Sequence, residues 1–345
     1  MLLEKLSNAR GVSGDEADVR DILIDALRGR VDEYRVDSIG NLIALKKAKG
    51  ARGRAALKVM LAAHMDEVGL MIVHHDSNGH LRFHKVGGID DRVLLSKVVW
   101  IGKDKIPGVI GVKPIHLIKG KEREQVLNAD ALTIDIGAKS KEEAQGWVKI
   151  GDYATFATTF AEIGERCVEG KALDDRVGCV ALVDVLKHDY PFDVYGVFTA
   201  QEEVGARGAR VAAYAIEPDY AFALEGTVCD DSPKTKDVSP VTRVGAGPAI
   251  SFADNSLLAD RRLVNLLVET AQENKIPFQF KQAIAGGTDA GRIHIVKAGV
   301  PSVAIAVPTR YIHSPVSLLS LKDLENEIIL LTKALPKLAK GLPDL

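Results

Sequence analysis

The sequence predicts an α/β domain that is interrupted by a small all-β unit, and two observations support this fold class. Up to about residue 67, and again from about residue 163, apolar runs typical of buried strands alternate with segments typical of helices. Between these parts, short strand-like segments are separated by turn residues, and helical periodicity is scarce. We therefore expect a discontinuous α/β domain of residues 1–67 and 163–345, with an inserted β-barrel-like domain of residues 68–162.

The first 64 residues predict two helices followed by three strands. Ser13-Gly14-Asp15-Glu16 matches a capping box, so a helix is expected from there to about Arg28. Residues 34–37 and 42–46 flank a glycine-containing turn and predict a hairpin. Residues 57–63 (LKVMLAA) form a run that is apolar apart from Lys58, which is typical of a strand buried on both faces.

The inserted unit and the C-terminal part differ in the secondary structure that their sequences predict. In the insertion, strands are expected at residues 69–75, 81–85, 98–101 and 131–136, with a hairpin turn at Ser77-Asn78-Gly79. Beyond the insertion, helices are expected at residues 174–187, 206–215, 257–275, 289–297 and 321–342, and strands at residues 194–200, 220–224 and 302–307. This alternation is what an α/β domain requires.

Composition excludes several classes of protein. The net charge is −2 with mixed charges and no long basic stretch, so neither a nucleic-acid partner nor a membrane surface is expected. No apolar run approaches the roughly 20 residues of a membrane span. Three cysteines without a C-x-x-C pair suggest neither a disulfide framework nor a zinc knuckle. With no signal pattern at the N-terminus, we expect a cytoplasmic protein.

Polar groups that can bind a metal follow the predicted strands. His64 and Asp66 end the first apolar run, and Glu202 and Glu203 follow the strand at residues 194–200. Strand ends are where an α/β sheet places its chemistry. Because residues two apart in a strand share a face, Asp66 could accept a hydrogen bond from His64 and orient its ring, or the two could form a structural pair. One of the two glutamates could bind metal while the other faces a substrate; a solvated loop is the alternative.

Three further groups complete the set. Glu225 ends the strand at residues 220–224, Asp174 opens a helix, and His313 lies in a loop after the last predicted strand. Each has an ordinary explanation: Glu225 as a strand-end acid, Asp174 as a helix cap and His313 as a loop residue. Asp175 is expected to pair locally with Arg176. Two imidazoles with several carboxylates nevertheless suit zinc or a similar ion, and two metals sharing Asp174 would explain the whole set.

Other chemistries are not supported by motifs. The sequence contains no H-E-x-x-H and no G-x-S-x-G. The glycine-rich segment of residues 286–291 lacks the spacing of a nucleotide-binding loop, although its backbone and Thr288 could approach a bound ligand.

The ordered set of motifs resembles the M42 family of metallo-aminopeptidases, of the TET and deblocking aminopeptidase type, whose relatives are often labelled endoglucanase M. The resemblance covers nearly the whole chain. It rests on Gly11-Val12-Ser13-Gly14, Ile39-Gly40-Asn41-Leu42, Ala63-His64-Met65-Asp66-Glu67-Val68-Gly69, Leu173-Asp174-Asp175-Arg176, Gln201-Glu202-Glu203-Val204-Gly205, Gly286-Gly287-Thr288-Asp289-Ala290-Gly291 and Val307-Pro308-Thr309-Arg310-Tyr311-Ile312-His313-Ser314-Pro315.

This resemblance implies a zinc-exopeptidase-like α/β/α catalytic domain with a PDZ-like inserted domain, and two divalent ions per subunit, zinc or else cobalt. His64 and Glu225 would hold one ion, Glu203 and His313 the other, and Asp174 would bridge them. Many family members have Asp where this chain has Glu225, but the longer carboxylate still reaches a metal. The resemblance also implies a homo-oligomer, a dodecamer built from dimers.

The implied reaction is hydrolysis of the N-terminal residue from a peptide. Glu202 would be the general base, a water bridging the metals the nucleophile, and Asp66 would orient His64. Three alternatives stay open: a related carboxypeptidase or deacylase, a glycoside hydrolase, and a non-catalytic scaffold or metal-storage protein. Two carboxylates alone would serve a glycoside hydrolase, but they would leave the histidines unexplained.

Overall fold

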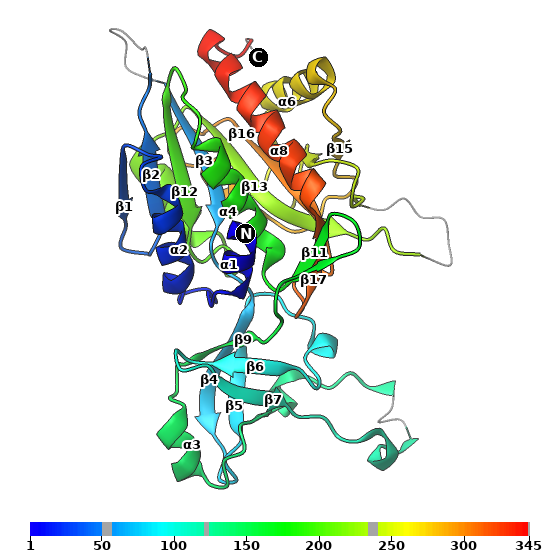
Figure 1. The fold of residues 1–345 in the computed structure, drawn as a ribbon. Helices are drawn as coiled ribbons and strands as arrows, with labels where there is room; N and C mark the ends of the chain where they lie inside the picture. Colours follow the sequence, from blue (N-terminus) through cyan, green and yellow to red (C-terminus); the bar gives the residue numbers. More distant parts are fainter. Residues whose placement is uncertain (50–56, 121–123, 234–240, 344–345) are drawn as a thin grey trace.

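The computed structural model describes residues 1–49, 57–120, 124–233 and 241–343, and it consists of a layered α/β part and a separate β-barrel (Figure 1). Within these residues, the α/β part contains an 11-stranded sheet and the second part a closed barrel of β4, β5, β8, β7, β6 and β9. The predicted fold class, an α/β domain with an inserted β-barrel, is confirmed. The described part of the chain has no helix with the length and apolar character needed to cross a membrane.

The large sheet places its parallel strands at its centre. Its order is β1 (Glu33–Val36), β2 (Leu42–Lys46), β12 (Asp193–Thr199), β3 (Lys58–His64), β13 (Tyr220–Cys229), β16 (Ser302–Arg310), β17 (Ser317–Ser320), β11 (Cys167–Gly170) and β10 (Ala161–Ile163). The short strands β14 (Ala249–Ser251) and β15 (Gln279–Phe280) extend from β16. Because β12, β3, β13 and β16 run parallel, their carboxyl ends meet at one edge of the sheet.

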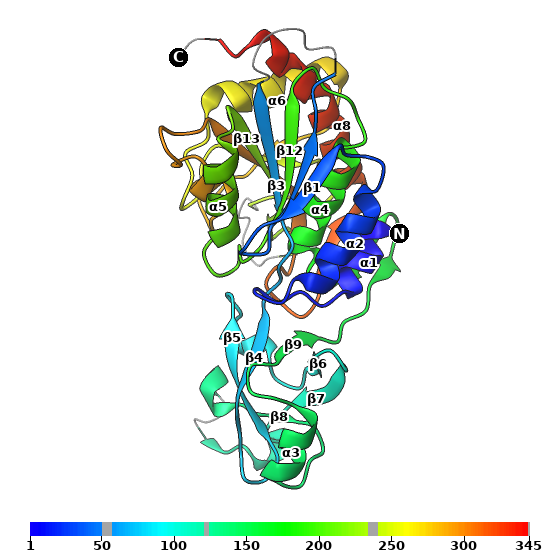
Figure 2. The same cartoon turned by 90° about the vertical axis from the view of Figure 1, so that its left-hand side faces the viewer.

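Helices cover both faces of this sheet (Figure 2). One face packs against α1 (Leu2–Asn8), α2 (Ala17–Leu27), α4 (Leu173–Val185), α6 (Arg261–Asn274) and α8 (Leu321–Ala334), which continues as a 3-10 helix (Leu335–Lys340). The other face packs against α5 (Arg207–Ile216) and α7 (Ala290–Ile293). The central strands are therefore buried on both sides, which explains their uninterrupted apolar runs.

The barrel has its own core. Its strands are β4 (Gly69–His75), β5 (Leu81–Val86), β6 (Val98–Ile101), β7 (Ile106–Ile110), β8 (Ile134–Asp135) and β9 (Tyr153–Phe156), with α3 (Lys141–Trp147) beside them. Short 3-10 helices lie in its connections (Asp91–Val93, Ile115–Leu117 and Ala129–Ala131). β9 ends in the barrel and β10 begins in the large sheet. The predicted domain boundaries at 67/68 and 162/163 stay a prediction.

One local prediction was wrong because tertiary partners replaced local ones. The capping box at residues 13–16 does not form: the Ser13 hydroxyl donates to Asp66 (2.6 Å), and the helix begins only at Ala17. The Glu16 carboxylate instead accepts from the backbone N–H groups of Gly14 and Gln201.

Several element bounds also differ from the prediction. The strand expected at residues 220–224 continues to Cys229, because β16 pairs with it in register along its whole length. The strand expected at residues 131–136 is limited to Ile134–Asp135. The helices expected at 257–275, 289–297 and 321–342 are shorter, at Arg261–Asn274, Ala290–Ile293 and Leu321–Ala334.

Candidate metal centre

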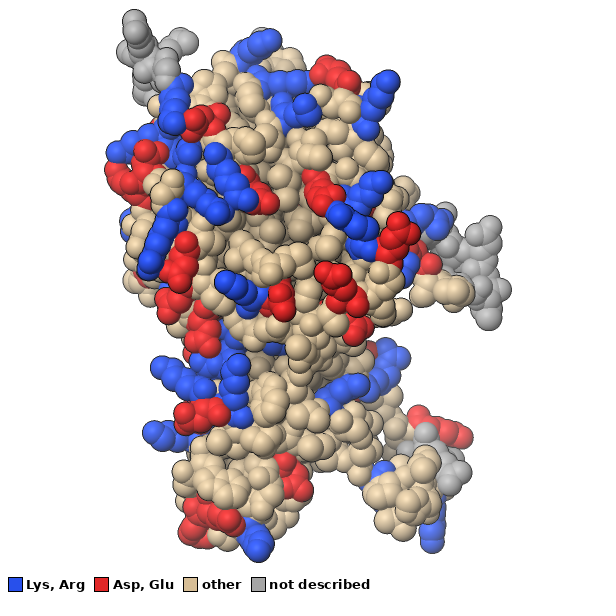
Figure 3. All heavy atoms as spheres, in the orientation of Figure 1, with Lys and Arg blue, Asp and Glu red and all other residues tan. Residues whose placement is uncertain are grey.

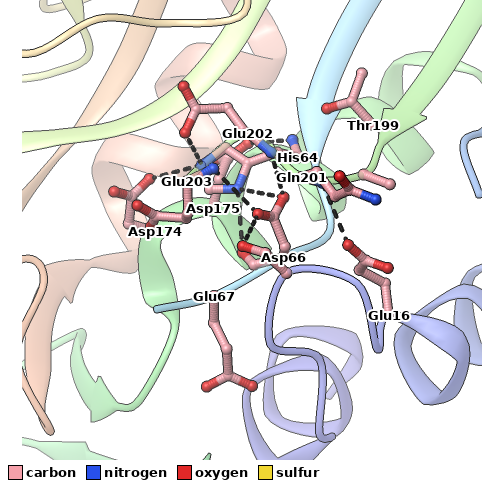
Figure 4. A network of polar contacts seen from close by, with 12 residues as sticks. Glu16, His64, Asp66, Glu67, Asp174, Asp175, Thr199, Gln201, Glu202 and Glu203 are labelled. Carbon is pink, nitrogen blue, oxygen red and sulfur yellow. Dashed lines mark hydrogen bonds and ion pairs between the residues drawn. The ribbon is translucent and has the colours of Figure 1, made fainter. Parts of the chain in front are cut away.

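The seven predicted site residues meet at the carboxyl edge of the parallel strands. His64 is the last residue of β3, and Glu202 and Glu203 follow β12. Glu225 lies within β13 rather than at its end, and His313 lies in the turn between β16 and β17. Figure 4 shows the side chains of His64, Asp66, Asp174, Glu202 and Glu203 converging from different elements.

Asp174 lies between the two histidines. Its Oδ1 is 3.4 Å from Nε2 of His64, and its Oδ2 is 3.6 Å from Nε2 of His313. The residue does not cap α4, because Ala172 holds the N-cap position and Asp174 has non-helical backbone angles. Oδ1 is buried and has no hydrogen-bond partner among the described residues. A buried carboxylate oxygen without a donor is costly, and a cation bound by Nε2 of His64 would satisfy it.

The remaining carboxylates divide between the two histidines. Oε2 of Glu225 is 3.7 Å and Oε2 of Glu202 is 3.9 Å from Nε2 of His64. Oε2 of Glu203 is 3.5 Å from Nε2 of His313. Ligand atoms of His64, Asp174 and Glu203 all lie within 4.8 Å of one another. Nitrogen and oxygen donors at these separations suit a divalent transition metal.

Each imidazole is held by a main-chain carbonyl on its far side. Nδ1 of His64 lies 3.1 Å from the backbone oxygen of Asp66, and Nδ1 of His313 lies 2.9 Å from the backbone oxygen of Gly88. An N–H on Nδ1 would donate to each carbonyl and leave the Nε2 lone pair directed at Asp174. Both rings are therefore oriented for metal binding through Nε2.

Asp66 is positioned differently from the prediction. Its carboxylate is 3.6 Å from Nδ1 of His64, so the main-chain oxygen, and not the carboxylate, is the nearer acceptor. The carboxylate instead accepts from the Ser13 hydroxyl and from the backbone N–H groups of Glu202 (2.9 Å) and Glu203 (3.1 Å). Asp66 thus links β3 to the turn that carries the two glutamates.

The structure brings two further acids, Asp175 and Asp289, next to the predicted site residues. Asp175 accepts from the backbone N–H of His64 (3.0 Å) and does not pair with Arg176, whose guanidinium contacts Glu67 instead. Asp289 donates its backbone N–H to Glu225 (3.2 Å), and its carboxylate accepts from the Thr199 hydroxyl. Asp289 belongs to a motif of the family resemblance, which was the only available signal for it.

The electrostatics of the site favour bound cations. Burial raises the pKa of Glu202 and Glu225 well above the ordinary carboxyl value, and that of Glu203 to about 7. Burial lowers the pKa of His313, but Asp174 and Glu203 outweigh it and raise that pKa to about 9. So many carboxylates in one buried site repel each other unless protons or metal ions compensate them.

The site opens into a cavity of about 530 Å³. His64, Asp174, Glu202, Glu203, Glu225 and His313 line it together with residues of the loop at 285–288. A volume of this size holds one or two amino-acid residues of a ligand. The arrangement can therefore bring a small polar substrate next to metal ions and to a carboxylate able to exchange protons.

Comparison with known proteins finds relatives that match nearly the whole chain. The family model described as M42 glutamyl aminopeptidase matches residues 40–330. Lysyl aminopeptidase of Pyrococcus furiosus is 34% identical over 99% of this chain and 95% of its own length. The structure of an aminopeptidase of the archaeon Desulfurococcus kamchatkensis has a TM-score of 0.92 at 36% identity, covering 100% of this chain and 97% of that one. TET1 peptidase of Pyrococcus horikoshii, which can assemble into a tetrahedron or a large octahedral shell, has a TM-score of 0.85 at 37% identity, covering 97% and 98%.

Proposed function

This chain belongs to the M42 peptidase family, and from that premise we propose that it is a dinuclear-metal aminopeptidase with Glu202 as its general base. Membership of the family makes it an aminopeptidase, a peptide hydrolase. The number of metal ions, their ligands and the role of each residue are the proposal.

The observation that carries the proposal is the position of Asp174 between two imidazoles. Each of its two oxygens faces the Nε2 atom of a different histidine, at 3.4 and 3.6 Å. A carboxylate with one oxygen toward each of two metal ions has this arrangement. We assign His64 and Glu225 to one ion, Glu203 and His313 to the other, and Asp174 to both.

Zinc fits these nitrogen and oxygen donors best, and cobalt is also suitable. When bound, the two ions would lower the pKa of a water molecule toward neutrality and polarise the scissile carbonyl of the peptide.

Glu202 is the group that moves the proton. It lies beside Nε2 of His64 without being needed as a ligand in the assignment above, and its pKa is raised by burial. It would accept the proton of the attacking water and deliver it to the nitrogen of the leaving amine. The Asp66 carboxylate accepts a hydrogen bond from the backbone N–H of Glu202. This bond fixes the backbone position from which the Glu202 side chain extends. Asp66 therefore serves as a positioning residue for Glu202 as well as for His64.

Substitution of Glu202 by Gln tests this assignment. We expect the variant to bind two ions per chain and to lose on the order of a thousandfold in kcat, because Gln cannot accept the proton. Glu142→Gln, in the exposed first turn of α3, is the matched control. Substrates should be aminoacyl-p-nitroanilides, with N-acyl amino acids and cellulose derivatives alongside. An unchanged kcat in the Gln variant would show that Glu202 is not the general base. Activity on N-acyl amino acids or cellulose derivatives alone would contradict aminopeptidase activity.

Self-association into a dodecamer is part of the proposal. Large apolar side chains of the barrel part are exposed, among them Ile115 (66%), Val126 (60%) and Leu117 (56%). These side chains are available for burial between subunits. Light scattering after gel filtration would measure the mass of the particle.

We also place the protein in the cytoplasm, because Cys167, Cys179 and Cys229 are free thiols.

A further inference from the structure

A buried ion pair lies behind the candidate metal centre and belongs to none of the roles assigned above. Nζ of Lys171 is 2.6 Å and 2.8 Å from the two carboxylate oxygens of Glu67, and it also donates to the backbone oxygen of Ala9 (2.6 Å). These contacts use all three N–H donors of the ammonium group. The side chains of Lys171 and Glu67 are only 4% and 3% exposed, so both charges are shielded from solvent.

The ion pair lies next to three of the proposed metal ligands. Glu67 and Lys171 line a gap of about 10 Å³ together with Asp174, Glu203 and His313. A gap of this size holds no more than about one water molecule. Within the described residues, no hydrogen bond joins the pair to these ligands. The pair can therefore act on the ligands only at short range, through the chain segments that it joins.

On one side, Glu67 is attached to the turn that carries two glutamates. It follows Asp66, whose carboxylate accepts from the backbone N–H groups of Glu202 and Glu203. Figure 4 shows the Glu67 side chain pointing away from this group, on the far side of the same connection. A contact that fixes Glu67 therefore also fixes the residue that holds Glu202 and Glu203.

On the other side, Lys171 is attached to the residue between the two histidines. Lys171 precedes Asp174 by three residues, and Leu173 between them is 0% exposed. The backbone oxygen of Lys171 also accepts from the Ser7 hydroxyl (2.7 Å). The short segment from Lys171 to Asp174 is therefore anchored at both ends, and a shift of the ammonium group would move it.

The stability of the fold gives weak grounds for charged residues at this place. Removing two charges from water costs about as much as their attraction returns, so apolar residues of similar volume can often replace a buried ion pair. Arg176, which is also buried, adds a second cation 3.3 Å from Glu67. Charge-assisted hydrogen bonds with fixed directions instead hold two segments at a defined distance.

We propose that Lys171 and Glu67 form a positioning pair that sets the spacing between Asp174 and Glu203, and with it the geometry of the metal ion that these ligands share with His313. This inference rests on the proposed metal centre. Neither residue of the pair touches the metal or the substrate, because both act through the ligands that their chain segments carry.

Lys171→Met is the first test, since it removes the ammonium group and keeps much of the side-chain volume. We expect one of the two zinc ions to bind about 10- to 100-fold more weakly in competition with a chelator. The visible absorption spectrum of the cobalt-loaded protein should change, because it reports the ligand geometry. For an aminoacyl-p-nitroanilide, kcat should fall about tenfold while KM stays nearly constant.

Lys46→Met is the matched control. Lys46 is also largely buried, with its side chain 12% exposed, and it pairs with Asp189 and with the backbone oxygen of Arg30. It lies opposite Val194 near the start of β12, at the edge of the sheet away from the metal centre. This variant should keep the zinc affinities, the cobalt spectrum and kcat of the wild type.

Glu67→Gln tests whether the two residues act as a unit. The substitution keeps the shape of the side chain and removes its charge, so we expect the same direction of change in zinc affinity and cobalt spectrum. The double variant Lys171→Met/Glu67→Gln should lose no more zinc affinity than Lys171→Met alone, because the pair is already broken. Fully additive losses would overturn a joint role.

Two further results would overturn the inference. One is an unchanged zinc affinity and cobalt spectrum in Lys171→Met. The other is a loss of stability in the metal-free protein combined with the cobalt spectrum of the wild type, which would make the pair a purely structural contact. Failure of both single variants to fold without metal would lead to the same conclusion.

Failure of the proposed function gives a different pattern. If the wild type binds two ions but hydrolyses no aminoacyl substrate, the aminopeptidase proposal fails, and zinc affinity with the cobalt spectrum still decides the role of Lys171. If the wild type binds no zinc or cobalt, the proposed metal centre fails and this inference fails with it. Two bound ions, normal turnover and no effect of Lys171→Met would overturn this inference alone.

Discussion

The two histidines of the candidate metal centre lie in contrasting surroundings. His64 ends a central strand, is 1% exposed, and has its ring held by the next residues of its own chain segment. His313 lies in a turn, its side chain is 41% exposed, and its ring is held by Gly88. Gly88 follows β5 of the inserted barrel, so the second half of the site is completed by a different part of the fold.

This contrast indicates that the two proposed metal positions differ in how rigidly their histidine ligands are held. The sheet core alone orients His64, whereas the orientation of His313 depends on a contact between the large sheet and the barrel. Partners behind a metal-bound histidine typically change metal affinity by about 10- to 100-fold. We therefore expect the ion held by His313 to exchange more readily than the ion held by His64.

The largest effect is expected from Asp174, which belongs to both halves. Asp174→Ala should abolish binding of both ions and lower kcat/KM on the order of a thousandfold or more, because Asp174 is the one described residue whose carboxylate pairs with both histidines. Metal analysis and turnover of an aminoacyl substrate measure this, with the exposed barrel variant Asp104→Asn as control. Retention of one full equivalent of metal would show that the halves are independent.

The next largest effect is a difference in the free energy of unfolding between variants of the two histidines. His64→Ala should lower the free energy of unfolding by about 2 kcal/mol, since it leaves a cavity in a buried strand. His313→Ala should change it by no more than about 0.5 kcal/mol, because the side chain is 41% exposed and lies in a turn outside the core. Denaturant unfolding of both metal-free proteins measures the difference. Equal losses would contradict the contrast in burial.

A smaller effect is expected at Gly88. A Cβ built there would already be in van der Waals contact with Nδ1 of His313, at 3.4 Å, so the additional methyl groups of Gly88→Val should displace the ring. We expect about tenfold weaker binding of one ion and unchanged binding of the other. Gly146→Val is the matched control in the same part of the chain, because a Cβ there meets nothing within 4 Å. Equal weakening of both ions, measured by competition with a chelator, would refute a separate second half.

The smallest effect concerns a buried acid behind the His64 half. Glu327 of α8 is 0% exposed, neither of its carboxylate oxygens has a described hydrogen-bond partner, and burial raises its pKa well above 4.5. Because the folded pKa is raised, stability falls as pH rises above 4.5, where the unfolded chain releases the proton first.

Glu327→Gln should remove that pH dependence. The variant should gain about 1 kcal/mol in free energy of unfolding at neutral pH, and the gain should disappear below pH 4, where both forms are uncharged. Unfolding curves at the two pH values, compared with the exposed variant Glu325→Gln, measure this. A gain that persists unchanged at low pH would point to packing instead of charge.

Much of the fold and the residue types of the site could be predicted because they depend on local patterns. The runs at residues 57–63, 194–200 and 302–307 are mainly apolar, as burial between two helical layers requires. His64, Glu202 and Glu203 follow such runs closely. Parallel strands bring their carboxyl ends to one edge, so placing the strands also brought the ligand types together.

Other features could not be predicted because they depend on which segments meet. Ser13 suits a helix cap as well as it suits a carboxylate partner, and only the proximity of Asp66 decides between them. Glu225 ends the apolar run, but pairing with β16 carries its strand four residues further. The sequence around Gly88 contains no pattern that indicates a contact between its backbone oxygen and the ring of His313.

The sequence by itself determined the α/β class, the inserted β unit and the presence, after buried strands, of side chains that can bind a metal. Hydrophobic periodicity and residue chemistry are properties of short sequence segments, so they can be recognised without the fold. Only the tertiary structure decided that Asp174 lies between two histidines, that Gly88 of the barrel orients His313, and that Lys171 pairs with Glu67. Those relations join residues far apart along the chain, and packing of the whole fold sets their distances.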